Sequence, residues 1–175
     1  MNARLRAAAV QASSQVATRI GPTVLDLTAA KDASAPLPEP FAAWFAGRGW
    51  RPHDHQLALL EAAVRGESTL LIAPTGGGKT LAGFLPSLVD LTDGASRADD
   101  RRGIHTLYIS PLKALAVDVA RNLTTPVEEM GLDIRLETRT GDTPASRRQR
   151  QRYAPPDILM TTPEQVALML SHRDS

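Results

Sequence analysis

The stretch Ala73-Pro74-Thr75-Gly76-Gly77-Gly78-Lys79-Thr80 decides the fold of this chain. A short apolar run precedes it at residues 69–73, and a segment with helical spacing follows at 81–91, so a Gly-rich turn joins a strand to a helix. Such glycines let backbone N–H groups turn toward phosphate, and the helix N-terminus adds partial positive charge. The pattern predicts a P-loop that binds ATP, with Thr75, Gly76, Gly77, Gly78, Lys79 and Thr80 as binding residues. Lys79 would reach the β- and γ-phosphates, and the Thr80 hydroxyl would bind Mg²⁺.

Strand and helix patterns alternate around this loop. Further strands are expected at 104–109, 134–138 and 157–161, and helices at 112–123 and 163–170. This alternation predicts an α/β fold, a parallel sheet flanked by helices. The third strand alternates in polarity, which places it nearer a sheet edge.

Hydroxyl–proline pairs are expected to open helices in this scheme, with the hydroxyl as N-cap and proline at the first helical position. The four pairs are Ser110-Pro111, Thr125-Pro126, Thr143-Pro144 and Thr162-Pro163. Thr125 with Glu128, and Thr162 with Gln165, also have capping-box spacing.

Two more helices are expected before the loop. Phe41, Trp44 and Phe45 would form one apolar helical face that ends at Gly47. In the following helix, the core-facing stripe is expected at Leu57, Leu60, Ala63 and Val64. Residues 1–38, rich in Ala and Pro, are predicted to be a flexible leader or linker, and residues 39–175 the folded domain.

Composition excludes several classes of protein. Twenty basic and nineteen acidic side chains give a net charge of +1, so a polyanionic partner must be argued from local patches. The chain has no cysteine, and His53 and His55 lack a third ligand nearby, so a zinc site is not expected. No apolar run approaches the roughly 18–20 residues of a membrane span. A cytoplasmic protein without membrane contact is expected.

Four further segments give the P-loop a family context. They are His55-Gln56, Tyr108-Ile109-Ser110-Pro111-Leu112-Lys113-Ala114-Leu115, Thr138-Arg139-Thr140-Gly141-Asp142-Thr143, and Thr161-Thr162-Pro163-Glu164. In this order, residues 41–172 resemble superfamily 2 DEAD/DEAH-box helicases, and more narrowly the Lhr-like branch with the ligase-associated DEXH-box helicases of bacterial DNA repair. Ala73, where the strict P-loop pattern has glycine, fits helicase loops better than kinases or small GTPases. The resemblance implies the first RecA-like domain of an ATP-dependent helicase or translocase.

The resemblance also implies roles for single residues. Gln56 would read adenine, with Trp50 or Phe45 as a possible stacking partner for the base. The nucleic-acid backbone would be held by Pro111, Leu112, Lys113, Arg139, Thr140, Gly141, Asp142, Thr162, Pro163 and Glu164. Single-stranded DNA is favoured over RNA, and a DNA-repair ligase or nuclease is a candidate partner. The alternative for both Ser/Thr-Pro corners is simple helix capping. The arginines at 147, 148, 150 and 152 are expected on a solvated helix face, with phosphate contact as the alternative.

The Asp-Glu-x-His motif of these helicases is absent from the 175 residues, so no catalytic residue is assigned here. We therefore expect a truncated domain that binds ATP without hydrolysing it, with the strand at 70–73 unpaired on one side and stability marginal. The alternatives are a non-catalytic remnant that binds ATP or single-stranded nucleic acid weakly, and another P-loop enzyme such as a small kinase.

Overall fold

The computed structural model describes residues 23–24, 37–93 and 103–171, in two compact units. Unit 1 covers residues 1–86 and unit 2 covers residues 87–175. Most of the predicted leader at 1–38 and the loop at 94–102 lie outside the described residues. Within the described ranges, no helix has the length and apolar character needed to cross a membrane.

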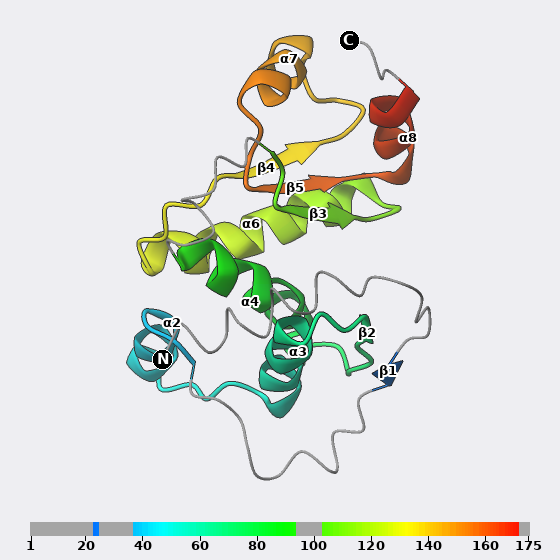
Figure 1. Ribbon diagram of the computed structural model, residues 1–175. Coiled ribbons are helices and arrows are strands. Elements are labelled where there is room, and N and C mark those ends of the chain that lie inside the picture. The colour runs from blue at the N-terminus through cyan, green and yellow to red at the C-terminus, as the bar shows by residue number, and fades with distance from the viewer. Residues whose placement is uncertain (1–22, 25–36, 94–102, 172–175) are drawn as a thin grey trace. The chain divides into compact units, whose positions relative to one another are not determined.

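Unit 1 holds the elements that lead into the P-loop (Figure 1). These are β1 (Thr23–Val24), α2 (Phe41–Gly47), α3 (Asp54–Val64), β2 (Thr69–Leu70) and the first turns of α4 (Lys79–Thr92). Strands β1 and β2 pair in parallel. Phe41 and Phe45 are buried on one face of α2, as their spacing predicts.

The strand expected at residues 69–73 is much shorter in the structure. Only Thr69–Leu70 pair, and the partner is the two-residue strand β1. Leu70 is 51% and Ile72 is 78% exposed, so the prediction of a buried strand is wrong for these residues. With a two-residue ladder as its hydrogen-bonding support, the segment passes directly into the loop after Leu70.

Helix α3 forms where predicted but buries a different stripe. The structure buries Ala58, Leu59 and Ala62 together with Gln56, whereas Val64 is 50% exposed. The prediction of a Leu57/Leu60/Ala63/Val64 face is therefore wrong. Both stripes have helical spacing, so periodicity could not choose between them.

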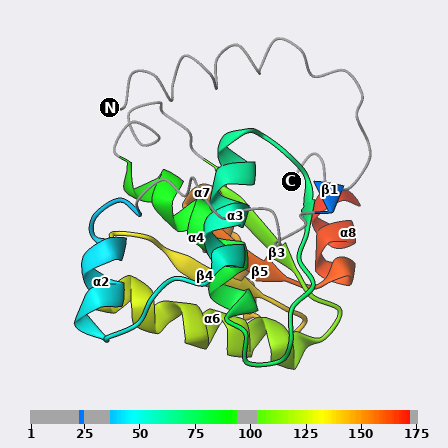
Figure 2. The ribbon, with the colours of Figure 1, turned by 90° about the horizontal axis from the view of Figure 1, so that it is seen from below.

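Unit 2 is a three-stranded parallel sheet with helices on both faces. Its elements are β3 (Thr106–Ile109), α6 (Lys113–Glu129), β4 (Leu136–Arg139), α7 (Ala145–Tyr153), β5 (Ile158–Thr161) and α8 (Pro163–Ser171). The strand order is β3-β5-β4 with all pairs parallel, which confirms the α/β class and the edge position of β4. Helix α6 covers one face of this sheet, as Figure 2 shows, and α7 and α8 lie on the other (Figure 1).

The core of unit 2 sits around β5, whose four residues are all buried. Helix α6 turns a continuous stripe inward, and its buried apolar members are Ala116, Val119, Leu123 and Val127. Burial of a leucine or valine side chain contributes about 1.5–3 kcal/mol, so this stripe holds α6 against β4 and β5.

Three of the four hydroxyl–proline predictions are wrong in detail. Thr125-Pro126 opens no helix, because α6 continues to Glu129 with Pro126 inside it and buried. The apolar stripe that ends at Val127 keeps this last turn packed, which outweighs the hydrogen bond that proline cannot donate.

The helix after Ser110 begins at Lys113, two residues after Pro111, and the helix after Thr143 begins at Ala145, one residue after Pro144. The two hydroxyls stabilise turns instead. Ser110 Oγ accepts the N–H of Leu112 at 3.3 Å, and Thr143 Oγ1 accepts the N–H of Thr140 at 2.9 Å. Only Thr162-Pro163 opens a helix as predicted, with Pro163 as the first residue of α8.

We predict that Leu123→Ala lowers the free energy of unfolding by about 2–4 kcal/mol, because it leaves a cavity under α6. Leu123 is 1% exposed, whereas Leu115 on the same helix is 43% exposed. Leu115→Ala is therefore the matched control and should cost less than about 1 kcal/mol. Urea unfolding followed by circular dichroism measures both. Equal losses in the two variants would contradict the packing of α6 described here.

Candidate functional site

The Gly-rich loop between β2 and α4 has a backbone that side chains would disturb. Gly76 and Gly78 have positive φ values of 83° and 67°. A Cβ on Gly78 would lie 2.9 Å from Gln56 Nε2, and one on Gly77 would lie 3.1 Å from the Pro74 carbonyl oxygen. The N–H of Gly77 donates to that same carbonyl at 3.1 Å. Glycine is thus required here both for conformation and for space.

Lys79 turns its ammonium back into this loop. Its Nζ donates to the carbonyl oxygens of Ala73 at 2.8 Å and Pro74 at 2.6 Å, and the side chain remains exposed. The loop therefore places a positive charge beside the N-terminus of α4, where the helix dipole also favours anions. A phosphate at this point would meet both.

Thr80 is exposed in the first turn of α4, directly after Lys79. A single hydroxyl oxygen suits Mg²⁺, which keeps several of its waters and takes few protein ligands. The described residues contain no group of three His, Asp or Glu side chains that could hold a metal ion without further help. A role of Thr80 in binding Mg²⁺ together with a phosphate stays a prediction.

Gln56 links the start of α3 to the end of the loop. It is 2% exposed, its Oε1 accepts the N–H of His53 at 2.9 Å, and its Nε2 donates to the Gly78 carbonyl at 3.4 Å. The first of these bonds closes a capping box at the N-terminus of α3. In this conformation both ends of the carboxamide are used within the chain. A role in reading adenine stays a prediction.

The two aromatic residues considered for base stacking differ in exposure. Phe45 is buried in the core, so it has no surface to offer a base. Trp50 is 53% exposed, and the Arg48 guanidinium lies 4.8 Å from its ring centroid. Of the two, Trp50 has an accessible ring.

In unit 2, the three predicted nucleic-acid segments meet at one edge of the sheet. Thr161 pairs with Ile109 on one side and Arg139 on the other, so residues 110–113, 139–142 and 162–164 follow neighbouring strand ends. Ser110 N–H donates to the Thr161 carbonyl at 3.0 Å, and Thr161 Oγ1 donates to the Arg139 carbonyl at 2.7 Å. Lys113 and Asp142 form an ion pair across this edge.

The members of these segments differ in how they present themselves to solvent. The exposed ones are Pro111, Leu112, Lys113, Gly141, Asp142, Pro163 and Glu164. Thr140 and Thr162 are buried, and the turn at Thr140 is closed by Thr143. The exposed set surrounds the carboxyl ends of β3, β4 and β5, where parallel sheets collect ligands.

Arg139 is placed differently from the rest. Its Nε is buried without a hydrogen-bond partner, and the side chain lines a cavity together with residues of α7 and α8. Burial lowers the pKa of Arg139, and the neighbouring charges of Arg148 and Arg152 lower it further.

Glu164 occupies the first turn of α8. Its pKa is lowered first by a hydrogen bond from the Thr162 hydroxyl and then by its own backbone N–H. A carboxylate at a helix N-terminus is in a favourable field. The Thr162 hydroxyl thus stabilises the Glu164 carboxylate.

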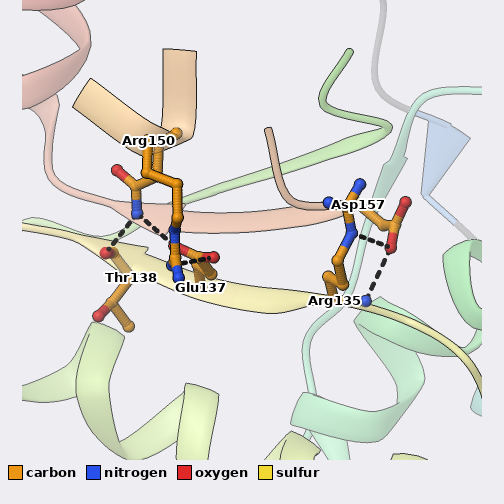
Figure 3. Close-up of polar contacts among 6 residues, drawn as sticks. Arg135, Glu137, Thr138, Arg150 and Asp157 are labelled. Atoms are coloured by element: carbon orange, nitrogen blue, oxygen red, sulfur yellow. Dashed lines mark hydrogen bonds and ion pairs between the residues drawn. The ribbon is translucent and has the colours of Figure 1, made fainter. Parts of the chain in front are cut away.

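Polar contacts that the sequence did not reveal hold α7 and β5 in place (Figure 3). Glu137 accepts hydrogen bonds from Arg150 at 2.6 Å and from Gln151 Nε2 at 2.8 Å. Asp157 accepts the backbone N–H of Arg135 at 2.7 Å. A glutamine within a basic helix gave no signal of burial, so only the tertiary structure could identify Gln151 as the link to β4.

Comparison with known proteins places these features in a family. The DEAD/DEAH box helicase profile matches residues 53–175. The chain is 45% identical over 138 residues to the Lhr helicase/probable uracil glycosylase of Mycolicibacterium smegmatis, covering 73% of this chain and 9% of that protein. It is 41% identical over 160 residues to the Lhr helicase/uracil glycosylase of Escherichia coli, covering 81% and 10%.

A solved structure supports the same grouping. The Mycobacterium smegmatis helicase Lhr bound to ssDNA and AMP-PNP matches with a TM-score of 0.65 and 42% identity, covering 77% of this chain and 18% of that one. The RecA-like fold inferred from the motifs is confirmed. The chain spans about a tenth of the length of the curated relatives described above.

We predict that Thr162→Val raises the pKa of Glu164 toward its ordinary value, because the hydroxyl donor is lost. A carboxyl whose pKa is lowered on folding stabilises the fold above its unfolded pKa, and this contribution disappears as pH falls through the folded pKa. The variant should lose that contribution. An NMR titration of the Glu164 carboxyl measures the shift. Thr162→Ser keeps the hydroxyl and should keep the lowered pKa; a Ser variant that behaves like Val would rule out the hydroxyl as the cause.

Proposed function

We propose, from the premise that this chain belongs to the DEAD/DEAH box helicase family, that it is the ATP-binding front part of an ATP-dependent helicase or translocase. The observation that carries the proposal is the glycine loop whose lysine ammonium lies beside the N-terminus of α4. Since the chain spans about a tenth of its curated relatives, the activity of the whole protein is itself part of the proposal.

For ATP, the loop residues 75–80 would surround the β- and γ-phosphates. Lys79 would exchange the Ala73 and Pro74 carbonyls for phosphate oxygens, which are charged and therefore stronger acceptors. Thr80 would complete the coordination of Mg²⁺ by phosphate and water. Gln56, held against Gly78, would be the residue that senses whether the loop is occupied and reads the adenine edge.

For nucleic acid, the exposed residues at the carboxyl ends of β3, β4 and β5 would hold the sugar–phosphate backbone of a single strand. Lys113 supplies the cation, and its ion pair with Asp142 orients it along the edge. Further contacts, mostly from the backbone, would come from Pro111, Leu112, Gly141, Pro163 and Glu164, with the buried residues Thr140 and Thr162 as support. We favour DNA over RNA, because a similar helicase was solved with ssDNA. A role in DNA repair beside a ligase or nuclease rests on the family resemblance.

By itself, the 175-residue chain is proposed to bind ATP without turning it over. Hydrolysis needs acids that hold Mg²⁺ and orient water. The Asp-Glu-x-His motif that would supply them does not occur in the 175 residues. The alternative function, weak binding of ATP or single strands by a non-catalytic remnant, shares this expectation and differs only in affinity.

We predict that Gly78→Ala weakens ATP binding at least about tenfold, or about 1.4 kcal/mol. The added Cβ would meet Gln56 Nε2 at 2.9 Å in a backbone conformation that alanine rarely adopts. Gly83→Ala is the matched control, because a Cβ there meets nothing within 4 Å. It should leave ATP affinity within about twofold while stabilising α4 by up to about 1 kcal/mol. Calorimetric titration with ATP and Mg²⁺ tests this, and unchanged affinity in Gly78→Ala would exclude the loop as the ATP site.

We predict that Lys113→Gln weakens binding of a single-stranded oligonucleotide by about 3–10-fold and reduces the slope of log K against log salt by about 0.7. Arg121→Gln, an equal loss of charge two turns further along α6, should change neither quantity much. Fluorescence anisotropy with matched DNA and RNA oligonucleotides measures both effects and the preference between the two. Equal losses in the two variants would mean that binding follows net charge, not this edge of the sheet.

A further inference from the structure

Unit 2 contains a cavity of about 720 Å³ that is lined by residues of α7, α8 and the sheet. Its size lies within the range of about 300–1,000 Å³ that is typical for small-molecule sites. Its polar wall holds the arginines Arg139, Arg148 and Arg152, and its apolar wall includes Leu159 and Met169. No acidic residue lines it.

The arginines of this cavity carry charge that the described part of the chain does not neutralise. Nearby, Arg150 pairs with Glu137 and Arg135 pairs with Asp157, as Figure 3 shows. None of the ion pairs among the described residues involves the three cavity arginines. Arg148 and Arg152 are close enough to Arg139 to lower its pKa further. Three like charges beside one cavity favour an anionic ligand.

Two buried polar atoms in the cavity wall lack a hydrogen-bond partner. One is Arg139 Nε, a donor, and the other is Gln151 Oε1, an acceptor. Gln151 is only 5% exposed, and its Nε2 is already bonded to Glu137 and Thr138. Buried polar groups are rarely left unpaired. A ligand with an acceptor for Arg139 Nε and a donor for Gln151 Oε1 would pair both atoms.

We propose that this cavity binds a single nucleoside monophosphate unit, either as a free nucleotide or as the phosphorylated end of a strand. Guanidinium groups bind phosphate bidentately, which suits Arg148 and Arg152 at the cavity wall. An N–H group of the base would satisfy Gln151 Oε1, and the ring would lie against Leu159 and Met169. The cavity includes none of residues 73–80, so this proposal does not depend on the proposed ATP site.

The test is a calorimetric titration of the full chain with AMP. The Arg148→Gln/Arg152→Gln variant should bind AMP at least about tenfold more weakly, because the phosphate loses both guanidinium partners. Arg121→Gln/Arg147→Gln is the matched control, since it removes the same charge and both residues lie outside the cavity wall. The comparison is repeated in a Gly78→Ala background, so that AMP bound at the P-loop does not contribute to the signal. Loss of AMP binding to the same extent in the control pair would overturn the proposal.

A second variant keeps the test decisive if the first does not fold. Arg148→Lys/Arg152→Lys preserves the charge, and it should weaken AMP binding severalfold because an ammonium cannot bind phosphate bidentately. The two sources of ligand are separated with thymidine decamers that carry a 5′-phosphate or a 5′-hydroxyl. A phosphate-dependent gain in affinity that the Gln variant abolishes identifies a strand end. An effect of the variants on AMP alone identifies a free nucleotide. No effect on either ligand overturns the proposal.

Discussion

The parallel pairing of β5 with a strand on each side is the constraint on which unit 2 depends. All four of its residues are buried, and its ladder fixes Ile109, Thr161 and Arg139 in one row. Because every strand runs the same way, the turns that follow β3, β4 and β5 must emerge at a single edge. The hydrogen bonds from Ser110 to Thr161 and from Thr161 to Arg139 then hold these turns together. Three motifs that lie far apart in sequence thereby become one surface.

Charge is distributed unevenly around this scaffold. Arg150 of α7 pairs with Glu137 of β4, and Arg135, just before β4, pairs with Asp157, just before β5. Lys113 is paired with Asp142 at the edge of the sheet. The arginines facing the α7–α8 cavity have no such acid among the cavity-lining residues. The net charge of +1 does not reveal the unpaired arginines at the cavity, because it counts charges without regard to their positions.

In unit 1, the main constraint is the close approach of the Gly-rich loop to the N-terminus of α3. A Cβ on Gly78 would lie 2.9 Å from Gln56 Nε2, so any side chain there would displace Gln56, which in turn caps α3 through His53. The loop and the N-terminus of α3 therefore form one hydrogen-bonded assembly. The lysine ammonium rests on loop carbonyls, which are weaker acceptors than phosphate oxygens. The Lys79 ammonium is thus placed where it can exchange these carbonyls for the oxygens of a bound phosphate.

The sequence by itself determined the α/β class, the P-loop between strand and helix, and the family motifs, because these depend on local periodicity and on glycine conformation. It did not determine that β5 lies between β3 and β4, since chain order does not fix strand order. It also misplaced the buried stripe of α3 and the helix start at Thr125, where two local patterns were equally good. Arg148 and Arg152 were expected on a solvated helix face, and only the packing of α7 on the sheet places them at a cavity. Burial and charge pairing are properties of neighbours in space, so only the tertiary structure decided them.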